Sequence, residues 1–204
     1  MKSRDEYTWS SNRPDLSHNY LYQSFKKKIL NKESFKNKSH LDLGCGNGSL
    51  TKLISPFFKN TIAIDPSVSG IEKAKLNYKG DIDFRNEDIE SIDSFFDVIS
   101  LFEVIEHVYD PILFLRNVKE KLNKNGKIFL STPFHGYIKN LIISLINGFD
   151  HHFDPLWTHG HIKFFSKKKI DQLCDILDLK LVNISYCGRI YPLSKSMICT
   201  IEKK

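Results

Sequence analysis

Short apolar runs alternate with amphipathic stretches along the chain between about residues 38 and 132. Most runs are rich in isoleucine, leucine and phenylalanine and are bounded by turn-forming residues, which is typical of strands buried in a parallel sheet. The stretches between them repeat apolar residues every three or four positions, as a helix does. Strands are expected at 38–43, 61–65, 82–85, 97–102 and 127–130, with helices at 47–54, 66–78 and 110–124. This pattern predicts an α/β fold with a mostly parallel sheet, helices on both faces and right-handed crossovers.

The flanking segments complete one expected domain over residues 1–204. Residues 1–37 are interpreted as an N-terminal arm followed by a helix, for which Ser17 is the expected N-cap. In the arm, Tyr7 and Trp9 could close over a bound ligand or pack as an ordinary tail. Beyond Ser166, a second expected N-cap, the pattern predicts a helix at 167–177 and strands at 179–186 and 194–201.

Residues 134–165 interrupt the alternation and are predicted to be an insertion that forms a lid. The stretch 137–149 has a strongly apolar helical pattern, and histidines and aromatic residues follow it. Long connections of this kind are commonly functional and here would lie over the carboxyl edge of the sheet. The helix could bind a hydrophobic acceptor, touch a membrane surface, form a dimer contact or be buried on its own domain. His151 and His152 could bind an acceptor or be exposed.

A glycine-rich turn follows the first expected strand and precedes a helix. Gly44, Gly46 and Gly48 allow left-handed backbone conformations and let a ligand approach the main chain closely. The N-terminal amides of the following helix would face that ligand, so the turn predicts a nucleotide-type cradle. Asp42 would repel a pyrophosphate but could accept hydrogen bonds from an ammonium group. Cys45 is interpreted as a small filler within the turn.

Acidic residues also stand at the ends of the other expected strands. Ligands of parallel α/β sheets lie at the carboxyl ends of the strands, so these acids should line one site. An acid at the end of the second strand is placed to bind ribose hydroxyls, and one after the third could accept from an adenine amine. The residues concerned are Asp65 with Pro66, Asp88 with Ile89, and Phe102 with Glu103.

Glu103, Glu106 and His107 have the spacing i, i+3, i+4 and would share one face of a helix beginning at residue 103. Together with His161 or His159 from the lid, with His161 favoured, they could bind Mg²⁺, Mn²⁺ or Zn²⁺ and so lower the pKa of a hydroxyl. Three alternatives stay open. Glu103 could contact only the cofactor; His107 could be a general base oriented by Glu106; or Glu106 and His107 could only brace the helix.

The segments LDLGCGNGSL, AIDPS, NEDIE, FDVISLFEVIEHV and GKIFLSTP resemble, in order, the motifs of the class I S-adenosylmethionine (SAM) methyltransferases. The resemblance implies a Rossmann-like, seven-stranded sheet in which the two final strands form an antiparallel pair. EVIEH with a later STP is similar to ubiquinone-pathway O-methyltransferases and to small-RNA 2′-O-methyltransferases. Both resemblances imply that Glu103, Glu106 and His107, with a downstream histidine, bind a divalent ion. Asp65 would then hold the ribose of SAM, the glycine turn its methionine end, and Asp88-Ile89 its adenine.

The expected reaction is O-methylation of a small or lipid-linked acceptor. Methylation of a sugar or polysaccharide precursor is an alternative because the aromatic lid would suit stacking on a ring. RNA methylation is disfavoured because no RNA-binding module or long basic surface is evident. Binding of SAM without catalysis is the non-enzymatic alternative.

Composition changes this picture little. The net charge of +6 suits an anionic acceptor, nucleic acid or an anionic membrane surface, but solvated lysines are the favoured explanation. The four cysteines have no disulfide or metal spacing, and no signal peptide or membrane-spanning run is evident, which predicts a cytoplasmic protein. A monomer or a homodimer is expected, with peripheral membrane contact through 137–149 as an option.

Overall fold

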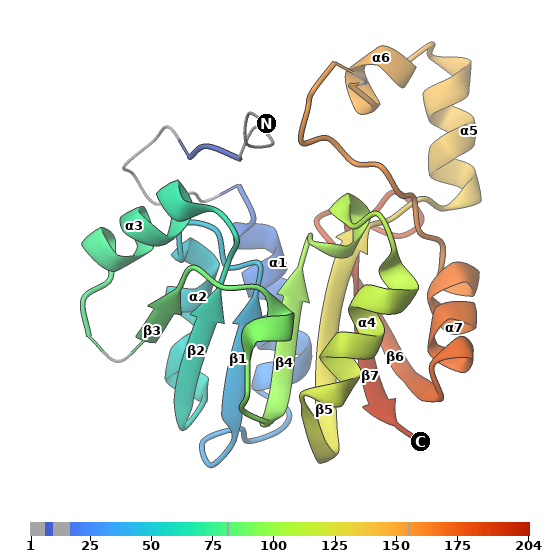
Figure 1. The fold of residues 1–204 in the computed structure, drawn as a ribbon. Coiled ribbons are helices and arrows are strands. Elements are labelled where there is room, and N and C mark those ends of the chain that lie inside the picture. Colours follow the sequence, from blue (N-terminus) through green and yellow to red (C-terminus); the bar gives the residue numbers. More distant parts are fainter. Residues whose placement is uncertain (1–6, 10–16, 81, 155) are drawn as a thin grey trace.

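The computed structural model describes residues 7–9, 17–80, 82–154 and 156–204. Its centre is a seven-stranded sheet in the order β3-β2-β1-β4-β5-β7-β6 (Figure 1). Neighbouring strands are parallel except for β7, which is antiparallel to both β5 and β6. The strands are β1 (Ser39–Leu43), β2 (Asn60–Ile64), β3 (Ile82–Arg85), β4 (Phe96–Phe102), β5 (Leu122–Pro133), β6 (Leu179–Cys187) and β7 (Ser196–Lys203). The predicted mostly parallel sheet and its final antiparallel pair are confirmed.

Helices cover both faces of the sheet because successive strand residues point in opposite directions. Leu41, Ile99 and Ile128 pack toward α4 and α7, whereas Val98, Phe102 and Phe129 pack toward α1 and α2. The helices are α1 (Asn19–Phe25), α2 (Ser49–Ile54), α3 (Val68–Asn77), α4 (Pro111–Glu120), α5 (Tyr137–Leu145), α6 (Phe149–His152) and α7 (Lys167–Ile176). Short turns join them: η1 (Lys26–Leu30), η2 (Ser55–Phe57), η3 (Ile89–Ser91) and η4 (Ile105–His107).

Helix starts agree with the predicted caps at several places and differ at others. The hydroxyl of Ser67 caps α3, that of Ser166 caps α7, and the Asp110 carboxylate caps α4 ahead of Pro111. The prediction of Ser17 as a cap was wrong: His18 is the N-cap of α1, without a side-chain bond to the helix. The expected helix at 47–54 begins only at residue 49, and the fifth strand begins at residue 122 rather than 127.

His40, on β1, is fully buried and linked to the carboxyl end of its own strand. Ser100 Oγ donates to Asp42 Oδ1 at 2.6 Å, so its single proton is used there and it must accept from Nε2 of His40 at 2.9 Å. Nδ1 of His40 then accepts from Thr61 Oγ1 at 3.2 Å. The ring also stacks on Phe58, with centroids 4.0 Å apart. These contacts favour a neutral imidazole, and burial lowers the pKa of His40 to about 3.

We expect His40 to weaken the fold in acid. A histidine whose pKa is depressed on folding stabilises the fold fully above its unfolded pKa near 6.5, and this contribution is lost as pH falls toward 3. Between pH 6.5 and about 3, protonation of His40 should lower the free energy of unfolding by about 1.4 kcal/mol for each unit by which the pH falls. His40→Gln should flatten that dependence in urea unfolding between pH 6.5 and 4.5. His18→Gln, at an exposed position, should keep the wild-type slope; an equal slope in both variants would contradict the assignment.

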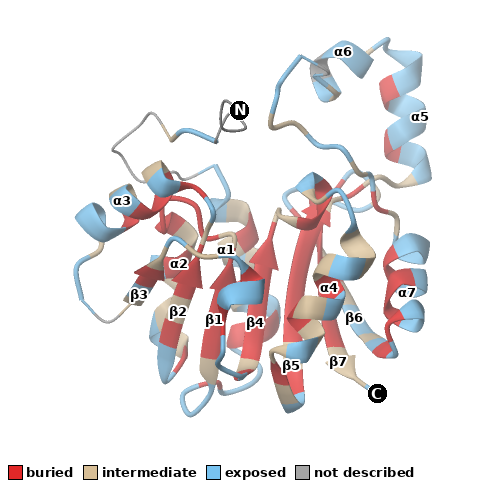
Figure 2. Cartoon of the chain, in the orientation of Figure 1, coloured by how far each residue is buried: buried red, intermediate tan, exposed pale blue. Residues whose placement is uncertain are grey.

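The lid rises above the carboxyl edge of the sheet as α5, α6 and an irregular return segment (Figure 1). The predicted helix at 137–149 is shorter than expected, ending at Leu145. Only Lys139 and Ile143 of α5 are buried, and the apolar face points largely outward (Figure 2). The alternative of a helix buried on its own domain is therefore wrong. Its exposed apolar residues are Tyr137, Ile138, Leu141, Ile142 and Leu145. Among the described residues, no helix has the length and apolarity needed to cross a bilayer.

Candidate active site

A cavity of about 900 Å³ lies at the carboxyl ends of the strands and extends under the lid. Its wall combines the glycine turn, the end of β4, the N-terminal arm and the lid, which are distant in sequence. Most of the acids expected at strand ends, namely Asp42, Asp65 and Glu103, line it. The volume lies in the upper range for ligand sites, and both a nucleoside-sized and a second ligand could share it.

The glycine turn creates space more than it presents hydrogen-bond donors. Gly44, Gly46 and Gly48 have φ of 78°, 53° and 76°, as the sequence predicted. Their amides, however, are used within the protein: Gly44 donates to Ile64 O at 2.8 Å, Gly46 to Asp65 Oδ2 at 2.8 Å and Gly48 to Cys45 O at 3.0 Å. At Gly46 a side chain would collide with the indole of Trp9. Close approach to the main chain is therefore what the glycines provide.

Asp42 is buried in the wall beneath this turn. Its two oxygens accept from Thr51 Oγ1 and Ser100 Oγ, both at 2.6 Å. Burial raises the pKa of Asp42 despite these bonds. Each carboxylate oxygen keeps a second lone pair, so the group can still accept from a ligand in the cavity.

Asp65, at the end of β2, organises the neighbouring loops. Its Oδ2 accepts from the amide of Gly46 and its Oδ1 from the amide of Ser67, each at 2.8 Å. Pro66 lines the cavity beside it. The two residues expected to bind the adenine ring do not lie beside Asp65. Ile89 is buried in the core, and neither Asp88 nor Ile89 is among the described residues that line the cavity. Their role stays a prediction.

The described part of the N-terminal arm covers the glycine turn. Ser67 Oγ donates to Tyr7 O at 2.7 Å, the amide of Trp9 donates to Ser69 Oγ at 3.1 Å, and the ammonium of Lys73 donates to Trp9 O. The Tyr7 ring also meets His159 of the lid edge-on, with centroids 5.3 Å apart. Both tryptophans of the chain, Trp9 and Trp157, line the cavity. The rest of the expected arm lies outside the described residues.

Glu103 does not belong to a helix, contrary to the predicted i, i+3, i+4 face. It directly follows β4 with φ of 54°, a left-handed conformation that is rare for a side-chain-bearing residue and frequent at functional sites. Its Oε1 accepts from Ser131 Oγ at 2.7 Å and its Oε2 from Ser196 Oγ at 3.2 Å, and Tyr20 contacts that serine at 2.8 Å. Burial raises the pKa of Glu103 to about 7. Phe102, just before it, lines the cavity as expected.

Glu106, His107 and His161 come together as a separate group. One ligand atom of each lies within 4.8 Å of the others, and the two imidazole centroids are 4.9 Å apart. Glu106 is fully buried, and neither carboxylate oxygen has a hydrogen-bond partner among the described residues. Burial and the charge of Glu103 raise its pKa well above the usual value. Burial lowers the pKa of both histidines, that of His161 to about 4.

The lid is attached to this group through main-chain atoms. The amides of Ile162 and Lys163 donate to Glu106 O at 2.9 and 3.0 Å. Nδ1 of His107 lies 3.3 Å from Gly160 O. The His161 ring lies against His107, whereas the His159 ring meets Tyr7 of the arm. The choice of His161 as a ligand stays a prediction.

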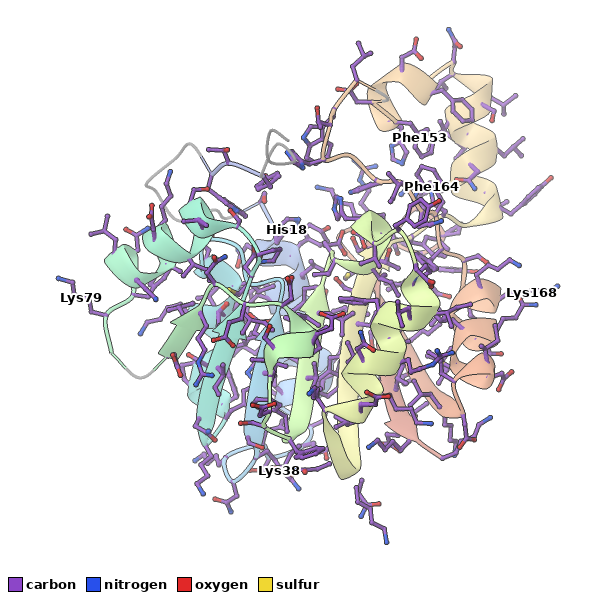
Figure 3. All side chains as sticks on the ribbon, in the orientation of Figure 1. His18, Lys38, Lys79, Phe153, Phe164 and Lys168 are labelled. Atoms are coloured by element: carbon purple, nitrogen blue, oxygen red, sulfur yellow. The ribbon has the colours of Figure 1, made fainter. Side chains whose placement is uncertain are left out.

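Several further residues line the cavity, and of these only Arg189 was considered from the sequence, as a residue that could hold an anionic acceptor although a surface position was favoured. Lys139 of α5 is only 8% exposed, and its ammonium donates to Phe134 O at 2.8 Å. His135 lies under the lid against Phe153 and Phe164, which point toward one another in Figure 3. Arg189 and Lys195 come from the β6–β7 connection. The one signal in the sequence was the position of Lys139 within the strongly apolar stretch 137–149. The side chain of His151 lies outside the part of the chain that the structure describes.

Solved structures share this architecture at low sequence identity. Magnesium protoporphyrin IX methyltransferase from Synechocystis PCC 6803 with bound SAH superposes with a TM-score of 0.70 at 14% identity, over 90% of this chain and 82% of that one. A SAM-dependent methyltransferase from Clostridium acetobutylicum superposes with a TM-score of 0.69 at 16% identity, over 93% of both chains. The fold is therefore that of the class I SAM-dependent methyltransferases, as the sequence predicted.

Residues 12–184 match the family model described as a methyltransferase domain, and the chain belongs to this family. The ubiquinone biosynthesis O-methyltransferase of Bradyrhizobium diazoefficiens is 32% identical over 157 residues, which are 74% of this chain and 61% of the relative. The mitochondrial ubiquinone biosynthesis O-methyltransferase of Schizosaccharomyces pombe is 30% identical over 151 residues, 70% of this chain and 54% of the relative. The chain thus spans between about half and six-tenths of the length of these two relatives.

Proposed function

We propose that the protein transfers a methyl group from SAM to an oxygen of a small or lipid-linked acceptor. The observation that supports this most is one continuous cavity that joins the glycine turn to Glu103, His107 and His161. Methyl transfer from a sulfonium is an in-line displacement, so holding the two reactants in one enclosed cavity supplies a large part of the catalysis. The methyltransferase domain and the O-methyltransferase names of the relatives support the same reaction.

The cofactor would occupy the half of the cavity at the glycine turn. Asp65 would accept the ribose hydroxyls, Asp42 would accept from the methionine ammonium, and the main chain at Gly44–Gly48 would approach the methionine end closely. Cys45, Pro66 and Phe102 complete the apolar wall. Adenine contacts by Asp88 and Ile89 remain part of the proposal.

Trp9 would act as a cover for the bound cofactor. We expect Trp9→Ala to weaken SAH binding about 3- to 10-fold, because it removes an aromatic contact worth about 0.5–1.5 kcal/mol over the glycine turn. Isothermal titration calorimetry measures the effect. Phe95→Ala is the control, since Phe95 is exposed at the amino end of β4 and does not line the cavity. Unchanged affinity in Trp9→Ala would show that the arm does not cover the cofactor.

Glu106, His107 and His161 would hold a divalent ion such as Mg²⁺, Mn²⁺ or Zn²⁺. The buried carboxylate without a partner fits such an ion, because burying it alone costs several kcal/mol, and neutral imidazoles add nitrogen ligands. When bound, the ion would lower the pKa of the acceptor hydroxyl. Glu103 accepts from Ser131 and Ser196 and lies outside the group of Glu106, His107 and His161, so it would face the cofactor and acceptor. The metal-free alternative makes His107 the general base, with Glu106 and His161 beside it.

The outward-facing apolar residues of α5 support a lipid-linked acceptor. Helices with such faces lie in membrane interfaces, and contact through residues 137–149 would bring the lid to the acceptor. The same face could instead join two copies of the chain. Methylation of a sugar precursor is the second candidate, supported by Trp157 and the aromatic lid beside the cavity.

The test is incubation of the purified protein with methyl-labelled SAM and a cell extract, with and without a chelator. Label in the organic phase that disappears with chelator would support metal-assisted methylation of a lipid-linked acceptor. Label in saccharide or RNA would replace the acceptor and keep the cofactor assignment. Failure to bind SAH in a parallel titration would overturn the proposed function.

A further inference from the structure

The half of the cavity under the lid has an excess of positive charge. Lys139, Arg189 and Lys195 line it. Among the described residues, the acids in the cavity wall are Asp42 and Asp65, which belong to the glycine turn, and Glu103. Outside the glycine turn, the cavity wall therefore combines three basic side chains with a single carboxyl group.

Lys139 is held inside this half rather than extended into solvent. Its side chain is buried on α5, a helix that otherwise exposes most of its residues. One N–H of the ammonium reaches Phe134 O, and an ammonium has three. Arg189 lies near enough that its charge, together with burial, lowers the pKa of Lys139. Lys139, His152 and Arg189 all line the same cavity. Burial and the charges of Lys139 and Arg189 lower the pKa of His152.

Two cations at a partly buried site need an anion. Lys139 is buried, so holding its ammonium charge out of water near the exposed guanidinium of Arg189 is unfavourable unless a negative group joins them. The charge of Glu103 raises the pKa of Lys139, but one carboxyl group can balance at most one of the two cations. A ligand is thus the natural source of the missing charge, and carboxylates and phosphates are the groups that arginine and lysine bind best.

We propose that the methyl acceptor carries an anionic group, a carboxylate or a phosphate, and that Lys139 and Arg189 bind it at the lid end of the cavity. This rests on the proposed function, because it assigns the substrate class of the same site. The rest of the acceptor would extend along the cavity toward His107 and His161. The anion would then orient the acceptor from the end opposite the cofactor.

The test is a titration of the full-length protein saturated with SAH, in the presence of EDTA, with three probes. Phenyl phosphate and benzoate carry the candidate anions, and benzamide is the uncharged match for benzoate. SAH keeps the probes out of the cofactor half, and EDTA removes metal as a site for anions. Wild type should bind at least one anion at least 10-fold more tightly than benzamide, with affinity falling as salt rises. The preferred anion identifies the acceptor group as phosphate or carboxylate.

Variants assign the effect to the two cations. Lys139→Met and Arg189→Gln should each weaken anion binding at least 10-fold and leave SAH affinity within twofold. Lys139→Arg should keep most of the anion affinity. Lys168→Met is the control for the loss of a lysine, because Lys168 is exposed on α7, does not line the cavity and points outward in Figure 3. Intact SAH binding without preference for an anion over benzamide, or with anion affinity in both variants equal to that of the wild type, would overturn this inference alone. Absence of SAH binding would overturn the proposed function itself, and this inference with it.

Discussion

Asp65→Ala should abolish most of the affinity for SAH. The substitution removes the proposed acceptor of the ribose hydroxyls and two bonds that shape the site, from the amides of Gly46 and Ser67. Hydrogen bonds to a charged group contribute about 1.5–3 kcal/mol each. Losing two such bonds to the ribose hydroxyls should therefore raise the dissociation constant of SAH roughly 100-fold or more.

Calorimetric titration of SAH measures this effect, with circular dichroism to confirm the fold. Asp83→Ala is the matched control, because Asp83 is an exposed acid on β3 that pairs with Arg85 outside the cavity. Asp65→Asn should have an intermediate SAH affinity, since its amide oxygen can still accept from the main-chain amide of Gly46 or of Ser67. A dissociation constant within threefold of wild type in Asp65→Ala would refute the ribose assignment.

Glu106→Met should stop methyl transfer and stabilise the protein at the same time. Its carboxyl group is fully buried without a hydrogen-bond partner among the described residues. A buried polar group in that state costs about 1–3 kcal/mol, which an apolar side chain of similar size avoids. The methyl-transfer rate should fall about 100-fold or more, as expected for loss of a metal ligand or of the partner of a general base. SAH affinity should stay within twofold.

Thermal unfolding distinguishes the two roles proposed for Glu106, His107 and His161, a metal site and a metal-free general base. If the three residues hold a metal ion, Mg²⁺, Mn²⁺ or Zn²⁺ should raise the melting temperature of the wild type but not that of Glu106→Met. With His107 as a metal-free base, no ion raises the melting temperature and activity survives chelation. Glu120→Met, an exposed substitution on α4, should match the wild type in every measurement. A fully active Glu106→Met variant would show that Glu106 has only a structural role.

The order of strands and helices could be predicted because each element carries its own signal. An apolar run, a glycine turn and an aspartate cap act over a few residues, so β1, β4 and α4 were predictable with small errors at their ends. The place of β7 between β5 and β6 depends on pairing between distant segments. Local pattern does not encode that pairing, and only the family resemblance predicted the antiparallel pair.

The candidate site was predictable where it follows the strand ends. Asp42, Asp65 and Glu103 line the cavity because parallel strands share one carboxyl edge. The helix expected at Glu103 does not form there, since the residue takes a left-handed conformation and only a short turn follows at Ile105–His107. Lys139 was missed because its burial depends on how the lid folds over the sheet, which helical periodicity does not reveal.

The lid is fastened near both ends to backbone oxygen atoms of other segments: the Phe134 amide donates to Lys195 O at its start, and the amides of Ile162 and Lys163 donate to Glu106 O at its end. Every type of residue supplies a carbonyl oxygen, so these two acceptor atoms survive substitution of the side chains that carry them. The segment between the fastenings, roughly 140–161, can therefore change in sequence and length while the sheet and the glycine turn stay intact. In evolutionary terms it is an exchangeable module, through which one cofactor-binding core can gain new acceptors.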